Sequence, residues 1–267
     1  MTGYEKLISA EERNNSILCV GLDIVADRMP THIERSIDGM LQFNKAIINS
    51  TSDLVSSYKI NFAFYEQYGI RGFELLKKTI DSIPKEIHII ADAKRGDIGN
   101  TSRAYAKAVF EEFKCDSITV SPYMGEDSVS PFLRYEDKMV FLLCLTSNSG
   151  SKDFEKQKIG SDYLYEVVLK KSMKWGTTQN LGYVVGATHP KELKSIREKA
   201  PNSFFLIPGV GAQGGSPYDV ITANNNGPAI INSSRGIIYA GGNELKYAEF
   251  SRLAALELRK QLNESRM

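Results

Sequence analysis

The chain has 267 residues, of which 42% are hydrophobic and 24% are charged, and its formal net charge is +1. This hydrophobic content is enough for one large core. The balanced charge argues against a nucleic-acid groove or a membrane-surface patch, because both require clustered basic residues. A small anionic substrate is compatible with it, since one or two well-placed Arg or Lys side chains suffice.

Three cysteines, Cys19, Cys115 and Cys144, lie far apart in or beside apolar runs and form no CxxC pair. We expect buried free thiols with no zinc site and no disulfide, which suits a reducing compartment. The N-terminus is polar and has no signal-peptide core, and no apolar run reaches the roughly 18–20 residues that cross a bilayer. We therefore expect a soluble, cytoplasmic protein with no membrane or nucleic-acid partner.

Along the chain, a short apolar run recurs and is each time followed by a longer segment with helical spacing. The runs are residues 16–23, 57–62, 87–93, 117–122, 140–147, 182–187, 204–209 and 229–234. Because they are mostly apolar on both faces, they are typical of buried parallel strands. Helices are predicted between them, for example at residues 39–54, 126–136 and 162–176, the last ending at Gly176 as a C-cap.

Eight strands that alternate with helices predict a parallel sheet, and eight is the number that closes a (β/α)8 barrel. An open doubly wound sheet is the alternative. It would need a glycine-rich turn after its first strand, where this chain reads GLDIVADRMP without GxGxxG. Since no linker divides the chain, we predict one TIM-barrel domain over residues 1–267, with a helical extension at about residues 1–15.

Polar side chains end nearly every predicted strand. In a TIM barrel these ends all face the active site, so residues far apart in sequence would meet there. They are Asp23, Lys59, Asn61, Asp92, Lys94, Ser121, Thr146, Ser147, Ser233 and Ser234. Polar residues that merely begin loops are the alternative, and it is weakest for Lys59, Asp92 and Lys94, which lie inside or against apolar runs.

The segment IIADAKRGDIGNT holds the most informative charges. Asp92 and Lys94 are two residues apart on a strand and therefore point to the same face. Asp97 follows in the loop, and Lys59 ends the preceding strand. A surface ion-pair network is the alternative, but such a network does not need charges within apolar strands, where burial is costly. We interpret the cluster as functional.

Residues 92–98, DAKRGDI, resemble the DxKxxDI signature of orotidine 5′-phosphate decarboxylases. Lys59, one strand earlier, completes what resembles the Lys-Asp-Lys-Asp tetrad of that family. The sequence DAKRGDIGNT resembles the sequences of the longer branch of this family, and the resemblance extends from Asp23 to Arg235. The resemblance implies a homodimer that converts orotidine 5′-monophosphate to uridine 5′-monophosphate and CO2 in pyrimidine biosynthesis, without a cofactor or a metal.

The resemblance also implies roles for the catalytic residues. Lys94 would protonate C6 of the pyrimidine as CO2 leaves, and Asp92 would disfavour the substrate carboxylate. Lys59 would hold Asp92 and touch the ribose. Asp97 would enter the active site from the neighbouring subunit.

The implied substrate-binding residues are Asp23, Asn61, Ile98, Thr101, Ser147, Pro208, Gln213, Gly214, Ser234 and Arg235. Asp23 and Asn61 would bind ribose hydroxyls, and Ser147 would bind the base. Ile98 and Thr101 would again come from the neighbouring subunit. The loop at residues 147–160 would be a mobile lid.

The chemistry of decarboxylation can be argued from the residues alone. Loss of CO2 leaves an electron pair in an sp2 orbital at C6, and the sequence shows no cofactor motif that would supply an electron sink. A positioned ammonium both stabilises the carbanion and delivers a proton to it. Carboxylates beside Lys94 would keep it protonated against desolvation.

Glycines continue the seventh predicted strand, where residues 204–217 read FFLIPGVGAQGGSP, and Arg235 follows the eighth. TIM barrels often bind phosphate at these two loops. Glycines let backbone amides approach an anion, and Arg supplies a bidentate fork. A tight turn with a surface Arg is the alternative. In the family, the residues that match Gln213 and Arg235 bind the 5′-phosphate.

Two other functions stay open. A magnesium-dependent sugar-phosphate decarboxylase or aldolase of the same superfamily shares DxKxxD, but it carries an acidic metal ligand where this chain has Lys59, which repels a divalent cation. A non-catalytic nucleotide-binding protein would not need to keep costly buried charges.

His32, His88 and His189 match no metal-ligand spacing, and we expect them to be structural. We expect the same of Trp175.

Overall fold

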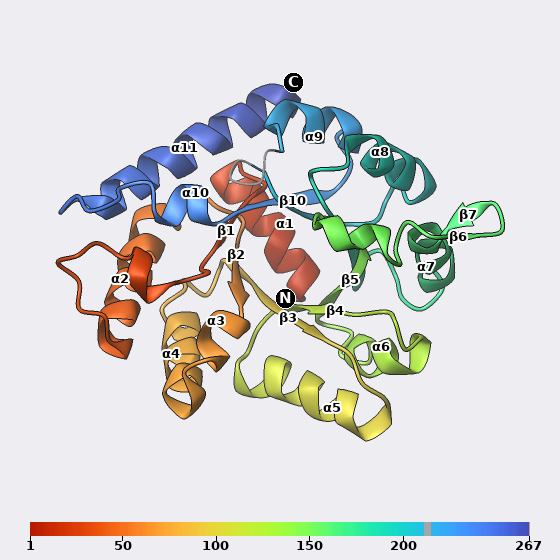
Figure 1. Cartoon of the computed structure of the whole chain (residues 1–267), viewed down its shortest axis with the longest axis horizontal. Coiled ribbons are helices and arrows are strands. Elements are labelled where there is room, and N and C mark those ends of the chain that lie inside the picture. Colours follow the sequence, from red (N-terminus) through yellow and green to blue (C-terminus); the bar gives the residue numbers. More distant parts are fainter. Residues whose placement is uncertain (211–214, 267) are drawn as a thin grey trace.

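In the computed structural model, eight parallel strands close into a barrel surrounded by helices (Figure 1). The structure describes residues 1–210 and 215–266. The barrel strands are β1 (Leu18–Gly21), β2 (Ser57–Asn61), β3 (His88–Arg95), β4 (Ser117–Val120), β5 (Met139–Leu145), β8 (Leu181–Val185), β9 (Phe205–Pro208) and β10 (Ala229–Ser233). β10 pairs with β1 and closes the ring. The predicted TIM barrel is confirmed, and every predicted apolar run overlaps one barrel strand.

The helices that follow the strands pack around the barrel. They are α2 (Ile37–Thr51), α3 (Ala63–Glu66), α4 (Gly69–Asp81), α5 (Gly99–Lys107), α6 (Glu126–Leu133), α7 (Leu164–Ser172), α8 (Pro190–Lys199), α9 (Pro217–Asn224), α10 (Arg235–Ile238) and α11 (Tyr247–Arg266). A π-helical turn, η2 (Ala108–Glu112), continues α5, and 3-10 turns form at η1 (Ala26–Arg28) and η3 (Ser149–Lys152). A two-stranded ribbon, β6 (Lys158–Ile159) with β7 (Asp162–Tyr163), precedes α7.

One predicted helix end is wrong. The helix expected to end at Gly176 stops at Ser172, with Met173 in a right-handed conformation as its C-cap. Gly176 is not a left-handed cap. A Cβ added there would lie 2.7 Å from Asn180 Oδ1 and 3.0 Å from the Cβ of Leu181, so close packing against the start of β8 accounts for this glycine.

The amino-terminal half of the barrel is filled with apolar side chains. The helix α1 (Gly3–Asn14) lies across this end of the barrel (Figure 1). Leu7 of α1 is fully buried against Ile90, Phe141 and Phe204, which belong to the same cluster inside the barrel. Outside the barrel, a second and larger cluster packs the strands against the helices. The apolar plug leaves the carboxyl ends of the strands as the open end of the barrel.

Two further expectations concern the whole chain. Cys19, Cys115 and Cys144 are buried free thiols, as predicted. Within residues 1–210 and 215–266, no helix has both the length and the apolarity to cross a membrane.

Candidate active site

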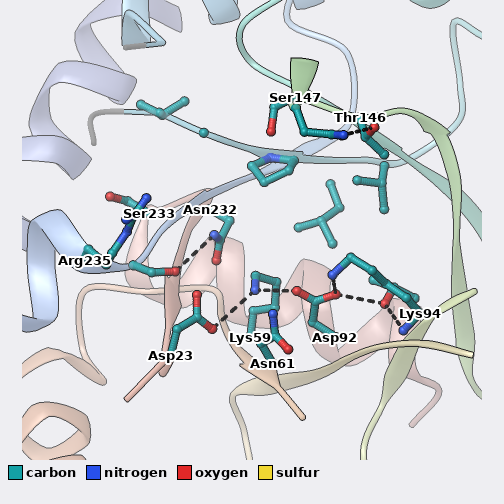
Figure 2. Close-up of a pocket in the computed structure, with 18 of the residues that line it drawn as sticks. Asp23, Lys59, Asn61, Asp92, Lys94, Thr146, Ser147, Asn232, Ser233 and Arg235 are labelled. Atoms are coloured by element: carbon teal, nitrogen blue, oxygen red, sulfur yellow. Dashed lines mark hydrogen bonds and ion pairs between the residues drawn. The ribbon is translucent and has the colours of Figure 1, made fainter. Parts of the chain in front are cut away.

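The carboxyl ends of the strands surround a cavity of ≈ 670 Å³ (Figure 2). Strand ends and loops from around the barrel contribute to its walls, so residues far apart in sequence meet there. The predicted site residues that line it are Asp23, Lys59, Asn61, Asp92, Lys94, Ser147, Pro208, Ser234 and Arg235.

Four charged side chains form an alternating row along one wall of the cavity (Figure 2). Lys59 Nζ lies 3.6 Å from Asp23 Oδ1 and 2.8 Å from Asp92 Oδ2. Lys94 Nζ lies 2.5 Å from the other oxygen of the Asp92 carboxylate. The two inner members of the row are buried, whereas the Lys94 side chain is 49% exposed. Lys94 is therefore the most exposed member of the row, since the Asp23 side chain at the other end is 17% exposed.

The inner charges hold each other in the ionised state. Burial by itself would lower the pKa of Lys59, but the carboxylates of Asp23 and Asp92 outweigh it and raise that pKa. Burial would raise the pKa of Asp92, but the ammoniums of Lys59 and Lys94 bring it well below its usual range. At neutral pH Lys59 and Asp92 are therefore fixed, opposite charges.

Lys94 reaches this row through an irregular piece of β3. The pairing of β3 with β4 shifts between Ala91 and Arg95, and Lys94 has a φ of 45°, in the left-handed region. Such a conformation is strained for a residue with a side chain and persists where the surroundings enforce it. Simple strand alternation predicted that Asp92 and Lys94 face the same side. They do meet, but over a bulge and not over a regular strand.

The opposite wall is formed by the loop after β5. Ser147 and Asn148 line the cavity there, next to Thr146 (Figure 2). The Glu155 carboxylate accepts hydrogen bonds from the Thr146 amide at 2.7 Å and from its hydroxyl at 2.8 Å. The half-buried carboxylate of Glu155 thus fastens the expected lid segment to the end of β5.

The expected phosphate end lies beside β9 and β10. Pro208 and Gly209 line the cavity, and Gly209 has a φ of 103°, which glycine adopts without strain. Arg235 begins α10, is exposed, and also lines the cavity. Gln213 and Gly214, which were expected to complete this end, lie outside the described residues.

Asp97, Ile98 and Thr101 are not among the residues that line this chain's own cavity. They lie in the loop after β3 and in the first turn of α5. The Asp97 carboxylate accepts a hydrogen bond from the Ile98 amide at 2.7 Å, and Ile98 is 57% exposed. As the structure describes it, this cavity is therefore lined without these three predicted site residues.

Sequence reasoning missed several residues of the cavity. Thr119 of β4 donates a hydrogen bond to Asp92 Oδ1 at 3.0 Å. Asn232 is 6% exposed and its Oδ1 has no hydrogen-bond partner among the described residues. Arg28 lies on the η1 turn, 4.5 Å from the centre of the Tyr239 ring. Thr119 and Asn232 lie on predicted strands, close in sequence to the predicted polar strand ends Ser121 and Ser233. Knowledge of the register between the barrel strands would have predicted that they line the cavity.

A (β/α)8 barrel with buried, alternating charges at its open end is the arrangement of an enzyme that acts on a small ligand. Comparison with known proteins narrows this class. Residues 16–250 match the family model described as orotidine 5′-phosphate decarboxylase / HUMPS family. The chain belongs to this family.

The relatives are similar over their whole length. The orotidine 5′-phosphate decarboxylase of Dehalococcoides mccartyi (strain CBDB1) is 50% identical over 274 residues, covering 100% of this chain and 99% of the relative. The one from Bacteroides fragilis (strain YCH46) is 47% identical over 266 residues, covering 97% of each.

Solved structures agree with these relatives. The Leishmania donovani OMP decarboxylase superposes with a TM-score of 0.87 at 38% identity, covering 100% of this chain and 99% of that one. The Leishmania donovani UMP synthase superposes with a TM-score of 0.89 at 39% identity, covering 100% of this chain. This chain spans only 57% of that longer protein.

Proposed function

We propose that this protein decarboxylates orotidine 5′-monophosphate to uridine 5′-monophosphate in pyrimidine biosynthesis, in the cytoplasm. The observation that carries the proposal is the charge row that ends in Lys94 at the cavity, 2.5 Å from Asp92. Membership of the family and full-length similarity to relatives named orotidine 5′-phosphate decarboxylase support it.

Lys94 is the proton donor in this proposal. When the bond between C6 and the carboxylate breaks, CO2 leaves and its electron pair stays on C6, in an orbital that the pyrimidine π-system cannot delocalise. The ammonium of Lys94 stabilises this charge and transfers one proton to C6. Solvent then reprotonates the amine, which is accessible because the side chain is half exposed.

Asp92 makes the substrate carboxylate unfavourable. Lys59 and Lys94 keep the pKa of Asp92 low, so its negative charge is present when the substrate binds. A second carboxylate brought near it is repelled, and this repulsion ends as neutral CO2 leaves. Because Lys59 and Thr119 hold Asp92 in place, the carboxylate cannot turn away from the substrate.

The remaining cavity residues would orient the substrate. Asp23 and Asn61 lie at the ends of the first two strands and would bind the ribose, and Ser147 would bind the base from the opposite wall. Arg235 would hold the phosphate with a bidentate fork, and phosphate binding energy would help to close the site. The remaining contacts in this proposal are Pro208, Gln213, Gly214 and Ser234.

The charge of the cavity suits such a substrate. Its cationic side chains outnumber its carboxylates, which belong to Asp23 and Asp92. The substrate carries a carboxylate and a phosphate, so an excess of cations favours its binding. The cations are Arg28, Lys59, Lys94 and Arg235.

The active site is completed by a second copy of the chain in this proposal. Asp97, Ile98 and Thr101 lie between the end of β3 and the first turn of α5, outside the lining of their own cavity, and would enter the neighbouring one. Exposed apolar side chains on neighbouring elements support a dimer surface there: Ile70 and Phe73 on α4, Ile98 and Tyr105 beside and on α5, and Tyr123 and Met124 before α6. Burial of these side chains would favour association.

A magnesium-dependent reaction of the same superfamily is the competing function. The ammonium of Lys59 lies between the carboxylates of Asp23 and Asp92, where a divalent cation would need them as ligands. This geometry favours the metal-independent reaction.

The test is the loss of ultraviolet absorbance when EDTA-treated protein is mixed with orotidine 5′-monophosphate. We expect rapid turnover, which magnesium does not increase and which the Lys94→Ala variant loses. A protein without turnover, or one that turns over only when magnesium is added, would contradict the proposal. Binding of uridine 5′-monophosphate without turnover would point to the non-catalytic function.

A further inference from the structure

The register of β3 against β4 leaves Thr119 opposite the bulge that carries the proposed catalytic residues. Ala91 pairs with Ile118, and the next paired residue of β3, Arg95, pairs with Val120. Three residues of β3 therefore face one residue of β4. A bulge of this kind interrupts the ladder and leaves backbone groups that need other partners.

The hydroxyl of Thr119 supplies one of those partners. It accepts a hydrogen bond from the backbone amide of Lys94 at 3.0 Å. In a regular parallel ladder, a carbonyl of the next strand would accept from such an amide. Here a side-chain oxygen takes its place, on a residue that is 1% exposed. The amide thus remains bonded while the backbone of Lys94 leaves the strand geometry.

The same hydroxyl donates its proton to Asp92 Oδ1 at 3.0 Å, the oxygen that Lys94 Nζ also contacts. This bond fixes the rotation of the carboxylate, so that its other oxygen meets Lys59 at 2.8 Å. One hydroxyl therefore connects the backbone of Lys94 to the side chain of Asp92. Both of its hydrogen-bonding functions are used, and both partners belong to the charge row.

We propose that Thr119 is a positioning residue for the reaction: its hydroxyl locks the β3 bulge and so aims the Lys94 ammonium at C6. The inference rests on the proposed function and extends it to a residue that touches no reacting atom. Lys94 has a φ of 45°, so its side-chain direction depends on a backbone state that must be held from outside. Without the hydroxyl, the Lys94 amide would lose its partner and the bulge would relax.

The experiment compares Thr119→Ser with Thr119→Ala, because the two variants lose the same methyl group and differ in the hydroxyl. We expect Thr119→Ser to keep kcat within about twofold of the wild type, and Thr119→Ala to lower it about 10- to 100-fold, since a misplaced catalytic group costs that much. KM and the dissociation constant for uridine 5′-monophosphate should change by less than about twofold, because Thr119 positions the proton donor and not the substrate. Ile118→Val, a neighbouring change within the apolar core, should leave kcat unaltered.

A second measurement does not depend on turnover. Hydrogen exchange of the Lys94 amide in the free protein should be faster in Thr119→Ala than in Thr119→Ser. Equal kcat in the Ser and Ala variants, or equal exchange of that amide, would overturn the inference. If wild-type protein did not act on orotidine 5′-monophosphate, the proposed function would fail, while the exchange data would still decide whether the hydroxyl holds the bulge.

Discussion

Each end of the barrel carries a lysine–aspartate ion pair, but the two lysines differ in how far they are exposed. At the amino-terminal end, Lys6 Nζ lies 2.7 Å from Asp116 Oδ2, and the same oxygen accepts the Ile89 amide at 2.9 Å. At the carboxyl end, Lys94 pairs with Asp92 at a similar distance but faces the cavity. The Lys6 side chain is 12% exposed and the Lys94 side chain is 49% exposed. The ammonium of Lys6 is shielded from solvent by its partners and contributes to stability. The ammonium of Lys94 is exposed to the cavity and can act on a ligand.

His88, at the amino-terminal end of the barrel, is also held by fixed partners and has a structural role. The ring of His88 lies 2.9 Å from the Gly3 carbonyl through Nδ1 and 2.9 Å from the Ser117 hydroxyl through Nε2. Burial lowers the pKa of His88 to about 4, so the neutral ring fastens α1 to the barrel. The expectation that His88 is structural is confirmed.

The largest expected effect separates the two lysines. Lys94→Ala should lower kcat by about 10⁴-fold, because both the proton donor and its charge are lost, while leaving the free energy of unfolding nearly unchanged. Lys6→Ala should lower the free energy of unfolding by about 3 kcal/mol, because Asp116 keeps a buried charge without its ammonium. Its kcat should stay at the wild-type level.

Steady-state kinetics and urea unfolding of both variants measure these effects. The functional distinction between the two ends would be wrong if Lys6→Ala lost activity without losing stability. It would be equally wrong if Lys94→Ala retained turnover.

The next prediction tests whether the active site is formed by one chain or by residues of two chains. Lys94→Ala and Asp97→Ala should each be inactive, but their co-expression should restore about 25% of wild-type activity, because half of the dimers are mixed and each mixed dimer keeps one intact site. Activity per purified dimer is the measurement. If Asp97 served its own chain, mixed dimers would contain no intact site and co-expression would restore nothing. Two copies of Lys94→Ala expressed together provide the control.

At the closed end, the expected effect is on the pH dependence of stability. The folded-state pKa of His88 is depressed to about 4 from an ordinary value of 6.5. Unfolded chains therefore take up a proton first as the pH falls, and stability that is present above pH 6.5 is lost progressively down to about pH 4. The loss attributable to His88 is at most ~3 kcal/mol. Urea unfolding of the wild type and of His88→Gln across this range should converge at low pH, whereas parallel curves would exclude this role.

The smallest effect concerns the phosphate end of the cavity. Arg235→Ala should lower kcat/KM for orotidine 5′-monophosphate by about 30-fold, as expected for the loss of charged hydrogen bonds. Added guanidinium should restore part of it. Orotidine, which has no phosphate, should react equally with the wild type and the variant. A comparable loss with orotidine would instead assign Arg235 a role in holding the barrel mouth together.

The strands and the barrel could be predicted from the sequence, because strands buried on both faces must be apolar and eight of them close a ring. The charges of Lys59, Asp92 and Lys94 were also visible, since charged residues against apolar strands stand out. This is local information, carried by residue type and spacing. The position of Gly176 was misread for the same reason, because its packing partner follows only in β8.

The tertiary structure decided how these residues meet. The bulge at Lys94 and the hydroxyl of Thr119 depend on the register between β3 and β4, which side-chain patterns do not encode. Arg28 and Asn232 also line the cavity, whereas Asp97 does not. Hydrogen bonds and contacts between strands are non-local. Residue types therefore determined which charges are present, and the closed barrel determined which of them face the ligand.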